Sequence, residues 1–250
     1  MAAMYAVYHG PSGVKAIATK VHFLSQVLAD QVKKLGYTVT NEHSFFDTLT
    51  IRADDVSAVH QAASAQRINL RRVNKELVGV TLDESVSPDD LVNIINVFAA
   101  GVAKQEVTLP YILNEYSASG ASIQYSFGPS LVRKSRYLEH PVFNTHHSET
   151  EMLRYIHHLQ SKDLSLVHGM IPLGSCTMKL NSTASMIPIT YPGFSKIHPF
   201  VPLEQAQGYQ TVIKVKSLTP VVRVGRSPCG TGTRKGFVHD HWFPQLLTAA

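Results

Sequence analysis

Apolar residues in the first hundred positions recur at helical spacing in three stretches. From Val14 to Leu35 they follow the pattern of a helix buried along one side, and Gly36 comes directly after as a terminating glycine. A second, shorter helix is predicted to begin at Asp54 or Asp55, since a carboxylate suits the N-cap position. A third is predicted after Ser87, where a proline and two aspartates occupy the first turn.

Between these helices lie three stretches with the composition of strands. Residues 45–51 alternate and are rich in β-branched side chains, and residues 68–73 and 77–82 are joined by the turn 74–76. The order helix, strand, helix, strand, strand, helix predicts a compact α+β unit over residues 14–100. This unit has no glycine-rich phosphate loop, no paired carboxylates placed for acid and base work, and no nucleophile beside a base. We therefore favour a structural lobe of a larger protein over a small ligand-binding module.

Residues 101–147 lack a clear period and are predicted to form a long irregular connector. Regular structure returns after it, because Ser148 and Glu151 have the spacing of a capping box and an apolar stripe follows at helical spacing. Four histidines flank or lie in this helix, but no two are four residues apart, so packing or surface roles are favoured over a metal site. The stripe is Met152, Tyr155, Ile156 and Leu159, and the histidines are His146, His147, His157 and His158.

Composition and charge narrow the classes of function. The 250 residues are 44% hydrophobic with a formal net charge of +5, as in an ordinary globular protein with a mild preference for anions. No apolar run is long enough for a bilayer and the first ten residues lack the features of a secretory leader, so neither segment is predicted. Two cysteines without C-x-x-C spacing favour a reducing compartment. The densest basic stretch, residues 131–136, is interpreted as a solvated loop, with phosphate or carboxylate binding as the weaker alternative and a nucleic-acid site disfavoured.

The stretch IPLGSCTMKLN carries the most concentrated candidate chemistry. Proline and glycine mark a turn, and Ser175, Cys176 and Thr177 bring hydroxyl, thiol and backbone donors together, an arrangement that can hold an anion or a carboxylate. A nucleophilic Cys176 would need a base, and His168 is the nearest candidate in sequence, so an inert buried thiol is favoured. Lys179 is a weak candidate for a Schiff base, which requires a desolvated amine near a phosphate site.

Four long strings stand in a fixed order between residue 1 and about residue 210. They are MAAMYAVYHG, FFDTL, YIHHLQSKDLSLVHGMIPLGSCTMKLNS and IHPFVPLEQAQGYQ. In content and order they resemble the glycine decarboxylase P-protein of the glycine cleavage system.

The resemblance implies an α/β enzyme that depends on pyridoxal phosphate. Its fold would be the aspartate-aminotransferase-like fold (fold type I), built from two homologous halves. Residues 1–110 would then be the C-terminal small lobe of the first half, 111–145 a connector and 146–210 the start of the second half. Residues 211–250 form a tail that does not match. Such enzymes release CO2 from glycine and transfer the aminomethyl group to the lipoyl arm of the H-protein.

The same resemblance implies which residues line the site. The family's Schiff-base lysine lies downstream in a segment with no counterpart here, so Lys179 is given a positional role and no catalytic residue is assigned. The loop is expected to shape the glycine or cofactor pocket of the complete enzyme, and no metal is expected. The lining candidates are Ser175, Cys176, Thr177, Lys179, Asn181 and His198.

The leading interpretation is a fragment of a pyridoxal-phosphate-dependent glycine decarboxylase that is inactive alone, because the Schiff-base segment is missing. The alternative is a non-catalytic interaction protein that binds a full-length P-protein through exposed apolar surface. A cysteine-dependent enzyme centred on Cys176 is a third hypothesis. The implied partners are glycine and the lipoyl H-protein, with a homo-oligomer as a further possibility and with nucleic acid and membrane excluded. The implied location is mitochondrial in a eukaryote and cytoplasmic in a bacterium.

Overall fold

The protein is described here by a computed structural model covering residues 1–112, 128–163 and 183–218. The chain divides into two compact units, residues 1–157 and residues 158–250. Each unit is described by itself. Within the described residues, no helix is both long and apolar enough to cross a bilayer.

The first unit opens with a long helix that is broken near its start. Helix α1 spans Ala2–Lys34, but Gly10 has φ 64° and ψ −179°, and Pro11 follows it. Proline lacks the N–H that would continue the helical ladder, and glycine can adopt the positive φ, so the two residues together explain the break. The predicted helix over residues 14–35 is confirmed, and the structure adds a short helical segment before the break.

Helix α1 ends just before Gly36, the residue that the sequence predicted as its terminating glycine. Gly36 has φ 96°, and its N–H donates to the carbonyl of Lys33 at 2.8 Å. The N–H of Tyr37 donates to the carbonyl of Val32 at 3.1 Å. These two bonds form a Schellman motif with glycine in the left-handed position, which satisfies carbonyls that the helix leaves open.

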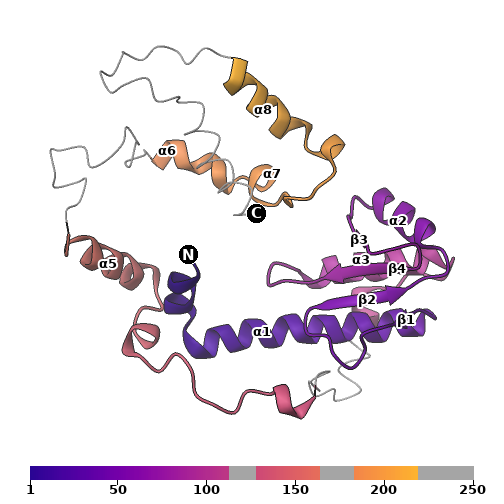
Figure 1. Ribbon diagram of the computed structural model, residues 1–250, viewed down its shortest axis with the longest axis horizontal. Helices are drawn as coiled ribbons and strands as arrows, with labels where there is room; N and C mark the ends of the chain where they lie inside the picture. The colour runs from indigo at the N-terminus through magenta and orange to yellow at the C-terminus, as the bar shows by residue number, and fades with distance from the viewer. Residues whose placement is uncertain (113–127, 164–182, 219–250) are drawn as a thin grey trace. The chain divides into compact units, whose positions relative to one another are not determined.

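Four short strands form one antiparallel sheet in the order β1-β2-β4-β3 (Figure 1). Their bounds are Thr38–Val39, Thr48–Arg52, Arg71–Arg72 and Leu77–Thr81 for β1, β2, β3 and β4. All three predicted strands exist, but the predicted range 45–51 begins too early and 68–73 is too long. Strand β1 was missed because two residues show no period.

A tertiary contact explains the first error of range, and a local helix end explains the second. Phe46 lies outside β2 because its carbonyl accepts a hydrogen bond from His22 Nδ1 at 2.8 Å and its ring stacks on that histidine. Arg67 has φ 59°, and the N–H of Ile68 donates to the carbonyl of Ala63 at 2.8 Å. The start of the predicted third strand is therefore used to terminate the preceding helix by a Schellman motif.

The two shorter helices begin where their caps predict. Helix α2 spans Val56–Ala65, and the Asp55 carboxylate accepts hydrogen bonds from two backbone N–H groups of the first turn, each at 2.9 Å. Helix α3 spans Pro88–Gly101. Ser87 Oγ accepts from the N–H of Asp90 at 3.1 Å, and the Asp90 carboxylate accepts from the N–H of Ser87 at 2.9 Å. This reciprocal pair is a capping box.

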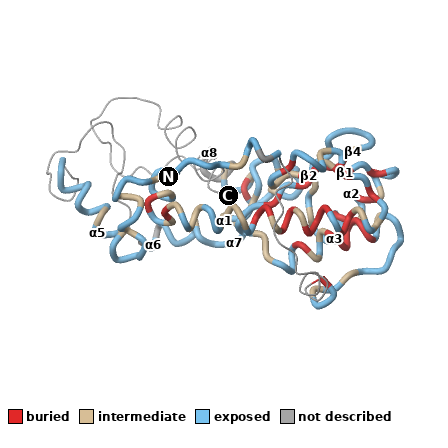
Figure 2. The backbone as a smooth tube through the Cα atoms, turned by 90° about the horizontal axis from the view of Figure 1, so that it is seen from below, coloured by how far each residue is buried: buried red, intermediate tan, exposed pale blue. Residues whose placement is uncertain are grey.

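The helices and the sheet share one hydrophobic core. Leu49 and Ile51 on β2, with Val78 and Val80 on β4, lie on the buried face of the sheet, and α1, α2 and α3 contribute the other side of the core. Figure 2 shows these buried positions along the strands, α1 and α3. The α+β prediction for this region is confirmed, and the aminotransferase-like fold of the whole enzyme stays a prediction.

Little regular structure precedes residue 149 in the described residues after 127. Residues 128–147 contain only two short 3-10 turns, Pro129–Leu131 and Pro141–Asn144, and helix α5 follows at Glu149–Gln160. Ser148 Oγ accepts from the N–H of Glu151 at 3.3 Å, which confirms the predicted helix start. The apolar stripe of this helix is not covered, since no residue of α5 is buried in the described part of the chain.

The described part of the second unit consists of short helical pieces. Its elements are α6 Thr183–Met186, a 3-10 turn at Ile187–Thr190, α7 Pro192–Ser195, a 3-10 turn at Leu203–Gln205 and α8 Gln207–Leu218. Tyr209 is the buried side chain among those described here. This unit therefore has no core of its own in the described residues.

Candidate functional site

Of the six residues predicted to line the site, the structure describes one. Five of them fall in the span 164–182, outside the described residues. These five are Ser175, Cys176, Thr177, Lys179 and Asn181. The sixth, His198, lies in the turn between α7 and the 3-10 turn at Leu203–Gln205.

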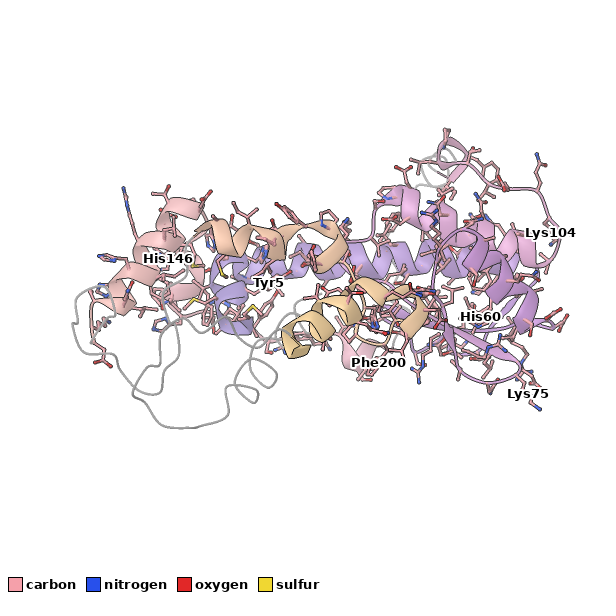
Figure 3. All side chains as sticks on the ribbon, turned by 90° about the horizontal axis from the view of Figure 1, so that it is seen from above. Tyr5, His60, Lys75, Lys104, His146 and Phe200 are labelled. Carbon is pink, nitrogen blue, oxygen red and sulfur yellow. The ribbon has the colours of Figure 1, made fainter. Side chains whose placement is uncertain are left out.

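His198 is exposed, and one of its ring nitrogens is already used. The N–H of Phe200 donates to His198 Nδ1 at 3.0 Å. Because Nδ1 accepts, the neutral ring carries its proton on Nε2, which leaves Nε2–H as a donor directed away from this contact. Phe200 itself is 90% exposed (Figure 3). The turn thus presents an imidazole donor beside an uncovered aromatic ring.

A buried tyrosine holds the segment that carries this turn. Tyr209 is only 8% exposed, and its hydroxyl donates to the carbonyl of Phe194 at 2.6 Å. The two rings also meet edge to face with centroids 5.5 Å apart. Burial raises the pKa of Tyr209, which keeps the phenol protonated and able to donate. Sequence reasoning missed this residue, although a lone aromatic among the polar residues that open α8 was a signal of a tertiary contact.

A second contact fixes the other end of the turn. Gln210 Nε2 donates to the carbonyl of Leu203 at 3.0 Å. Together, Tyr209 and Gln210 tie α8 to both sides of the His198 turn. The described residues around His198 include neither a nucleophile nor a carboxylate in hydrogen-bond contact with its ring. The arrangement can orient a polar group, and we assign it no acid or base role.

In the first unit, the connector binds the broken start of α1. Tyr137 donates its hydroxyl to the carbonyl of Pro11 at 2.8 Å, and His147 Nδ1 donates to the carbonyl of Tyr8 at 2.7 Å. A Cβ on Gly10 would lie 2.7 Å from His147 Cε1 and 2.8 Å from the carbonyl oxygen of Phe143. Position 10 therefore requires glycine for two reasons. Its φ is positive, and the neighbouring atoms leave no room for a Cβ.

The start of α1 also contacts the loop after β4. The hydroxyl of Tyr5 donates to the Glu84 carboxylate, and Lys20 Nζ donates to the Glu84 carbonyl at 3.0 Å. The hydrogen bond to the carboxylate raises the pKa of Tyr5, with burial and the negative charge of Glu84 adding to it. These contacts position the first helical segment within the unit.

The four histidines near α5 do not form a metal centre. His146 stacks on Tyr155 with ring centroids 4.3 Å apart, while His147 is engaged with the Tyr8 carbonyl. In the part of the chain that the structure describes, no three histidine, cysteine or acidic residues are grouped as metal ligands. The packing interpretation of His146 and His147 is supported by these contacts.

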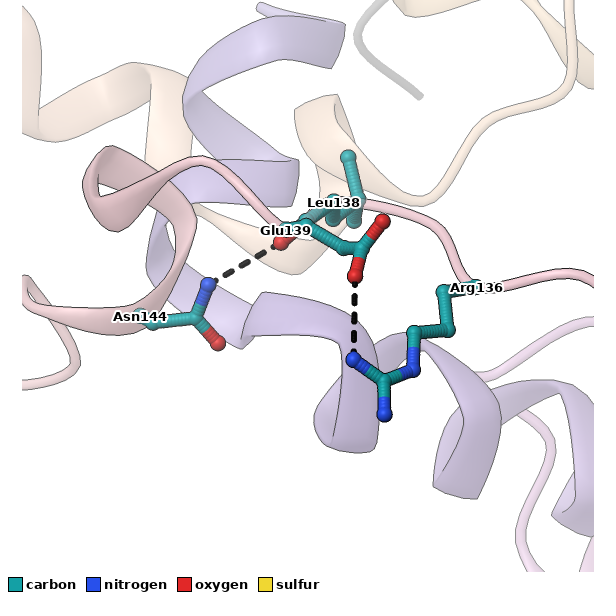
Figure 4. A network of polar contacts seen from close by, with 4 residues as sticks. All are labelled: Arg136, Leu138, Glu139 and Asn144. Atoms are coloured by element: carbon teal, nitrogen blue, oxygen red, sulfur yellow. Dashed lines mark hydrogen bonds and ion pairs between the residues drawn. The ribbon is translucent and has the colours of Figure 1, made fainter.

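The basic stretch at residues 131–136 is an exposed loop with local partners. Arg133 lies over the ring of Tyr137 at 5.4 Å, and Arg136 pairs with Glu139 at 3.4 Å. Figure 4 shows the second pair beside Asn144, whose Nδ2 donates to the carbonyl of Leu138 at 2.9 Å. Two cations of the basic stretch, Arg133 and Arg136, therefore have partners a few residues away in the chain.

The described residues do not fit a covalent pyridoxal-phosphate site. A Schiff-base lysine needs an amine withdrawn from water. None of the lysines whose side chains the structure describes is buried, and the least exposed, Lys33, is paired with Glu42. No step of cofactor chemistry is therefore assigned to these residues.

Comparison with known proteins gives one family-model match and several similar relatives. Residues 1–98 match the family model described as "Glycine cleavage system P-protein". The chain is 49% identical over 214 residues to "Glycine dehydrogenase (decarboxylating) 1, mitochondrial" of Arabidopsis thaliana, covering 86% of this chain and 20% of the relative. It is 51% identical over 214 residues to "Glycine dehydrogenase (decarboxylating)" of Paraburkholderia xenovorans, covering 85% and 22%. For the mitochondrial glycine dehydrogenase (decarboxylating) of Pisum sativum, the identity is 50% over 210 residues, covering 84% and 19%.

The chain spans about a fifth of the length of the curated relatives it matches. The match nevertheless covers most of this chain, and the overall identity is about half for each of the three relatives. The resemblance predicted from the four sequence strings is confirmed by the family-model match over residues 1–98 and by identity of about half to glycine dehydrogenases (decarboxylating) over most of the chain.

Proposed function

We propose that this chain is a segment of a glycine-decarboxylating P-protein. The complete enzyme would use pyridoxal phosphate, release CO2 from glycine and transfer the aminomethyl group to the lipoyl H-protein. The observation that carries the proposal is the identity of about 50% to glycine dehydrogenases (decarboxylating) over about 85% of the chain.

The chain alone is proposed to be inactive. Pyridoxal phosphate supplies the electron sink that decarboxylation needs, and the protein must supply its lysine and its orientation. The segment that carries that lysine in the family has no counterpart in this sequence. The lysines of the described residues lack the buried setting that a Schiff base requires.

Within the complete enzyme, two roles are proposed for this segment. Residues 1–110 serve as the small lobe of the first half of an aminotransferase-like enzyme, and the α+β unit with its own core supports this role. The loop that ends at Asn181 shapes the glycine or cofactor pocket, and His198 is proposed as a further lining residue. The support for His198 is its oriented ring on a turn held by Tyr209.

A chimera tests the proposal directly. The corresponding segment of the Paraburkholderia xenovorans relative is replaced by this chain, and CO2 release from glycine is measured beside the unmodified relative. We expect the chimera to bind pyridoxal phosphate and to decarboxylate glycine. A chimera that folds and binds cofactor but releases no CO2 contradicts the proposal.

A second experiment tests the inactivity of the isolated chain. The chain is incubated with pyridoxal phosphate, its absorbance is recorded before and after borohydride, and any reduced lysine adduct is mapped by mass spectrometry. We expect no adduct at a single site. A specific adduct at Lys179 would overturn the positional role given to that residue.

The alternative of a non-catalytic interaction protein has one supporting observation. Large apolar side chains are exposed on α5 and in the second unit, and such surface favours association. Among them are Leu153, Ile156, Ile187, Phe200 and Leu203. Co-purification of this chain with a full-length P-protein, without any gain in glycine turnover, would favour this alternative.

The location is proposed from the relatives. Both plant proteins compared above carry the word mitochondrial in their names, and a bacterial relative matches equally well. We propose a mitochondrial location for a eukaryotic source and a cytoplasmic one for a bacterial source.

A further inference from the structure

Residues 67–75, here called the basic hairpin, carry four cations, and the exposed Glu76 that completes the turn is the first anion after them. The sequence RINLRRVNK contributes Arg67, Arg71, Arg72 and Lys75, all exposed. In the described part of the chain, these four side chains make no hydrogen bond and no ion pair. They differ in this from the basic loop at residues 131–136, whose Arg133 and Arg136 have local partners.

The strand register sends two of these side chains to opposite sides of the sheet. Arg72 is opposite Val78, which is fully buried on the core face, so Arg72 lies on the side of the helices. Its charge contributes to lowering the pKa of His60 on α2. Arg71 is opposite Gly79, and a Cβ on Gly79 would lie 3.4 Å from Cβ of Arg71, so Arg71 covers the other face.

The face that Arg71 covers is polar and positively charged. By the same register, Arg52 and the threonines of β2 lie on this face, since Leu49 and Ile51 point into the core. The strand positions of β2, β3 and β4 on this face carry no acidic residue. The basic hairpin therefore forms the β3 edge of a sheet face that has no negative charge at its strand positions.

The positions of these cations argue against three kinds of binding partner. A single small anion is disfavoured because Arg71 and Arg72 diverge and cannot converge on one ion. A nucleic acid is disfavoured because the hairpin has no aromatic side chain on which bases could stack. A second copy of the same hairpin is disfavoured because its like charges would repel.

An extended chain of carboxylates fits the same positions. Guanidinium groups pair with carboxylates through paired, directional hydrogen bonds, and an acidic chain running along an edge can meet cations on both sides of it. Figure 3 shows the side chain of Lys75 directed away from the ribbon at the end of the hairpin, which extends the line of charge. We propose that the basic hairpin binds an acidic segment of a protein partner. This inference does not depend on the proposed function.

Peptide binding to the full chain tests the proposal. The probe is a fluorescein-labelled peptide of alternating glutamate and threonine, and the same peptide with glutamine replacing glutamate is its neutral control. We expect the double variant R71Q/K75Q to weaken binding of the acidic peptide about tenfold, as the loss of two charge-assisted contacts predicts. The neutral peptide should not bind measurably to either protein.

A matched variant separates the hairpin from net charge. K15Q/K162Q removes the same number of positive charges from exposed positions outside both basic stretches, and we expect it to change peptide affinity less than about twofold. Equal losses in the two double variants would overturn the proposal, because general charge would then explain binding. Failure of the unmodified chain to bind the acidic peptide at low salt would overturn it as well.

Two further measurements keep the result unambiguous. R71K/R72K retains every charge but loses the paired hydrogen bonds of the guanidinium groups, so it should weaken binding of the acidic peptide less than R71Q/K75Q does. Circular dichroism of each variant checks that the fold is intact. A single-stranded oligonucleotide is tested as a competitor. If it binds the hairpin more tightly than the peptide and loses that binding in R71Q/K75Q, the acidic-protein assignment is wrong.

Discussion

The sheet-and-helix part of the first unit and the described part of the second unit differ in how they bury apolar residues. Residues 14–112 share one core in which Phe98 is fully buried, whereas the described side chains of residues 158–213 include one buried residue, Tyr209. The second region keeps its local turns through hydrogen bonds to backbone carbonyls, at Phe194 and Leu203. We therefore expect the buried core to carry the stability of the first region and local contacts to carry that of the second.

The largest contrast should come from matched phenylalanines. Phe98→Ala removes a fully buried ring from the first unit and should lower its free energy of unfolding by about 3–5 kcal/mol. Phe200→Ala truncates a side chain that is 90% exposed. This variant should change the free energy of unfolding of the chain by less than about 0.5 kcal/mol. Urea unfolding followed by circular dichroism measures both, and similar losses would contradict the contrast.

Two glycines offer the next test. A Cβ at Gly101 would lie 2.8 Å from the Tyr37 hydroxyl and 2.9 Å from Val59 Cγ2, whereas a Cβ at Gly193 would meet nothing within 4 Å. Gly101→Ala should therefore destabilise the first unit by about 1–3 kcal/mol, because the core must shift to admit a methyl group. Gly193→Ala should be neutral within about 0.5 kcal/mol. Thermal unfolding of the two variants checks the difference, and a neutral Gly101→Ala would show that α3 can move away.

Two buried tyrosine hydroxyls allow a comparison in which the expected loss of stability is smaller. Tyr37 donates to the Phe98 carbonyl at 2.9 Å, as Tyr209 does to the Phe194 carbonyl. Each Tyr→Phe change should cost about 1 kcal/mol. The loss should be global for the first unit with Tyr37→Phe and confined to α7 and α8 with Tyr209→Phe. Hydrogen exchange measured by mass spectrometry distinguishes these outcomes, and global exposure in both variants would argue against two separate regions.

Tyr37 also gives an alkaline signature. Burial, with the negative charge of Asp54 adding to it, raises the pKa of Tyr37 to about 12. The unfolded chain ionises this phenol near its ordinary value of 10.0, so the stability that the neutral phenol contributes is complete below that pH and is lost as pH rises toward 12. Ultraviolet titration of phenolate should show a group that ionises near pH 12 and is missing in Tyr37→Phe.

The smallest expected effect concerns His60. Its Nε2 is buried without a hydrogen-bond partner in the described chain, and burial, with the charge of Arg72 adding to it, lowers the pKa of His60. The native state therefore resists protonation, so stability is complete above the ordinary pKa of 6.5 and declines as pH falls below it.

His60→Gln should flatten this acid slope in urea unfolding of the first unit. The matched change His198→Gln, at an exposed residue of the other unit, should leave the slope as it is. If His60→Gln left the acid dependence of unfolding unchanged, groups other than His60 would be responsible for it.

Much of the first unit could be read from the sequence because its signals are local. Gly36 ends α1 as predicted, and the capping residues Asp55 and Ser87 set the first residues of α2 and α3. The family resemblance was also present in the sequence, since it lies in the order of residues themselves.

The sequence predicted which residues line the candidate site but not how they are arranged in space. Five of its six members lie outside the described residues, and His198 is placed on an exposed turn. The sequence did not indicate that Tyr209 and Gln210 hold that turn, because those contacts join residues fifteen and seven positions apart.

The sequence by itself determined helix ends, the α+β order and the family resemblance, because caps, periods and long matching strings act over a few neighbouring residues. Only the tertiary structure decided the packing of His147 against Gly10, the position of Phe46 outside β2 and the side of the sheet to which each arginine of the basic hairpin points. Those features depend on partners distant in sequence, such as His147 beside Gly10 and Gly79 beneath Arg71, and a local pattern carries no information about such partners.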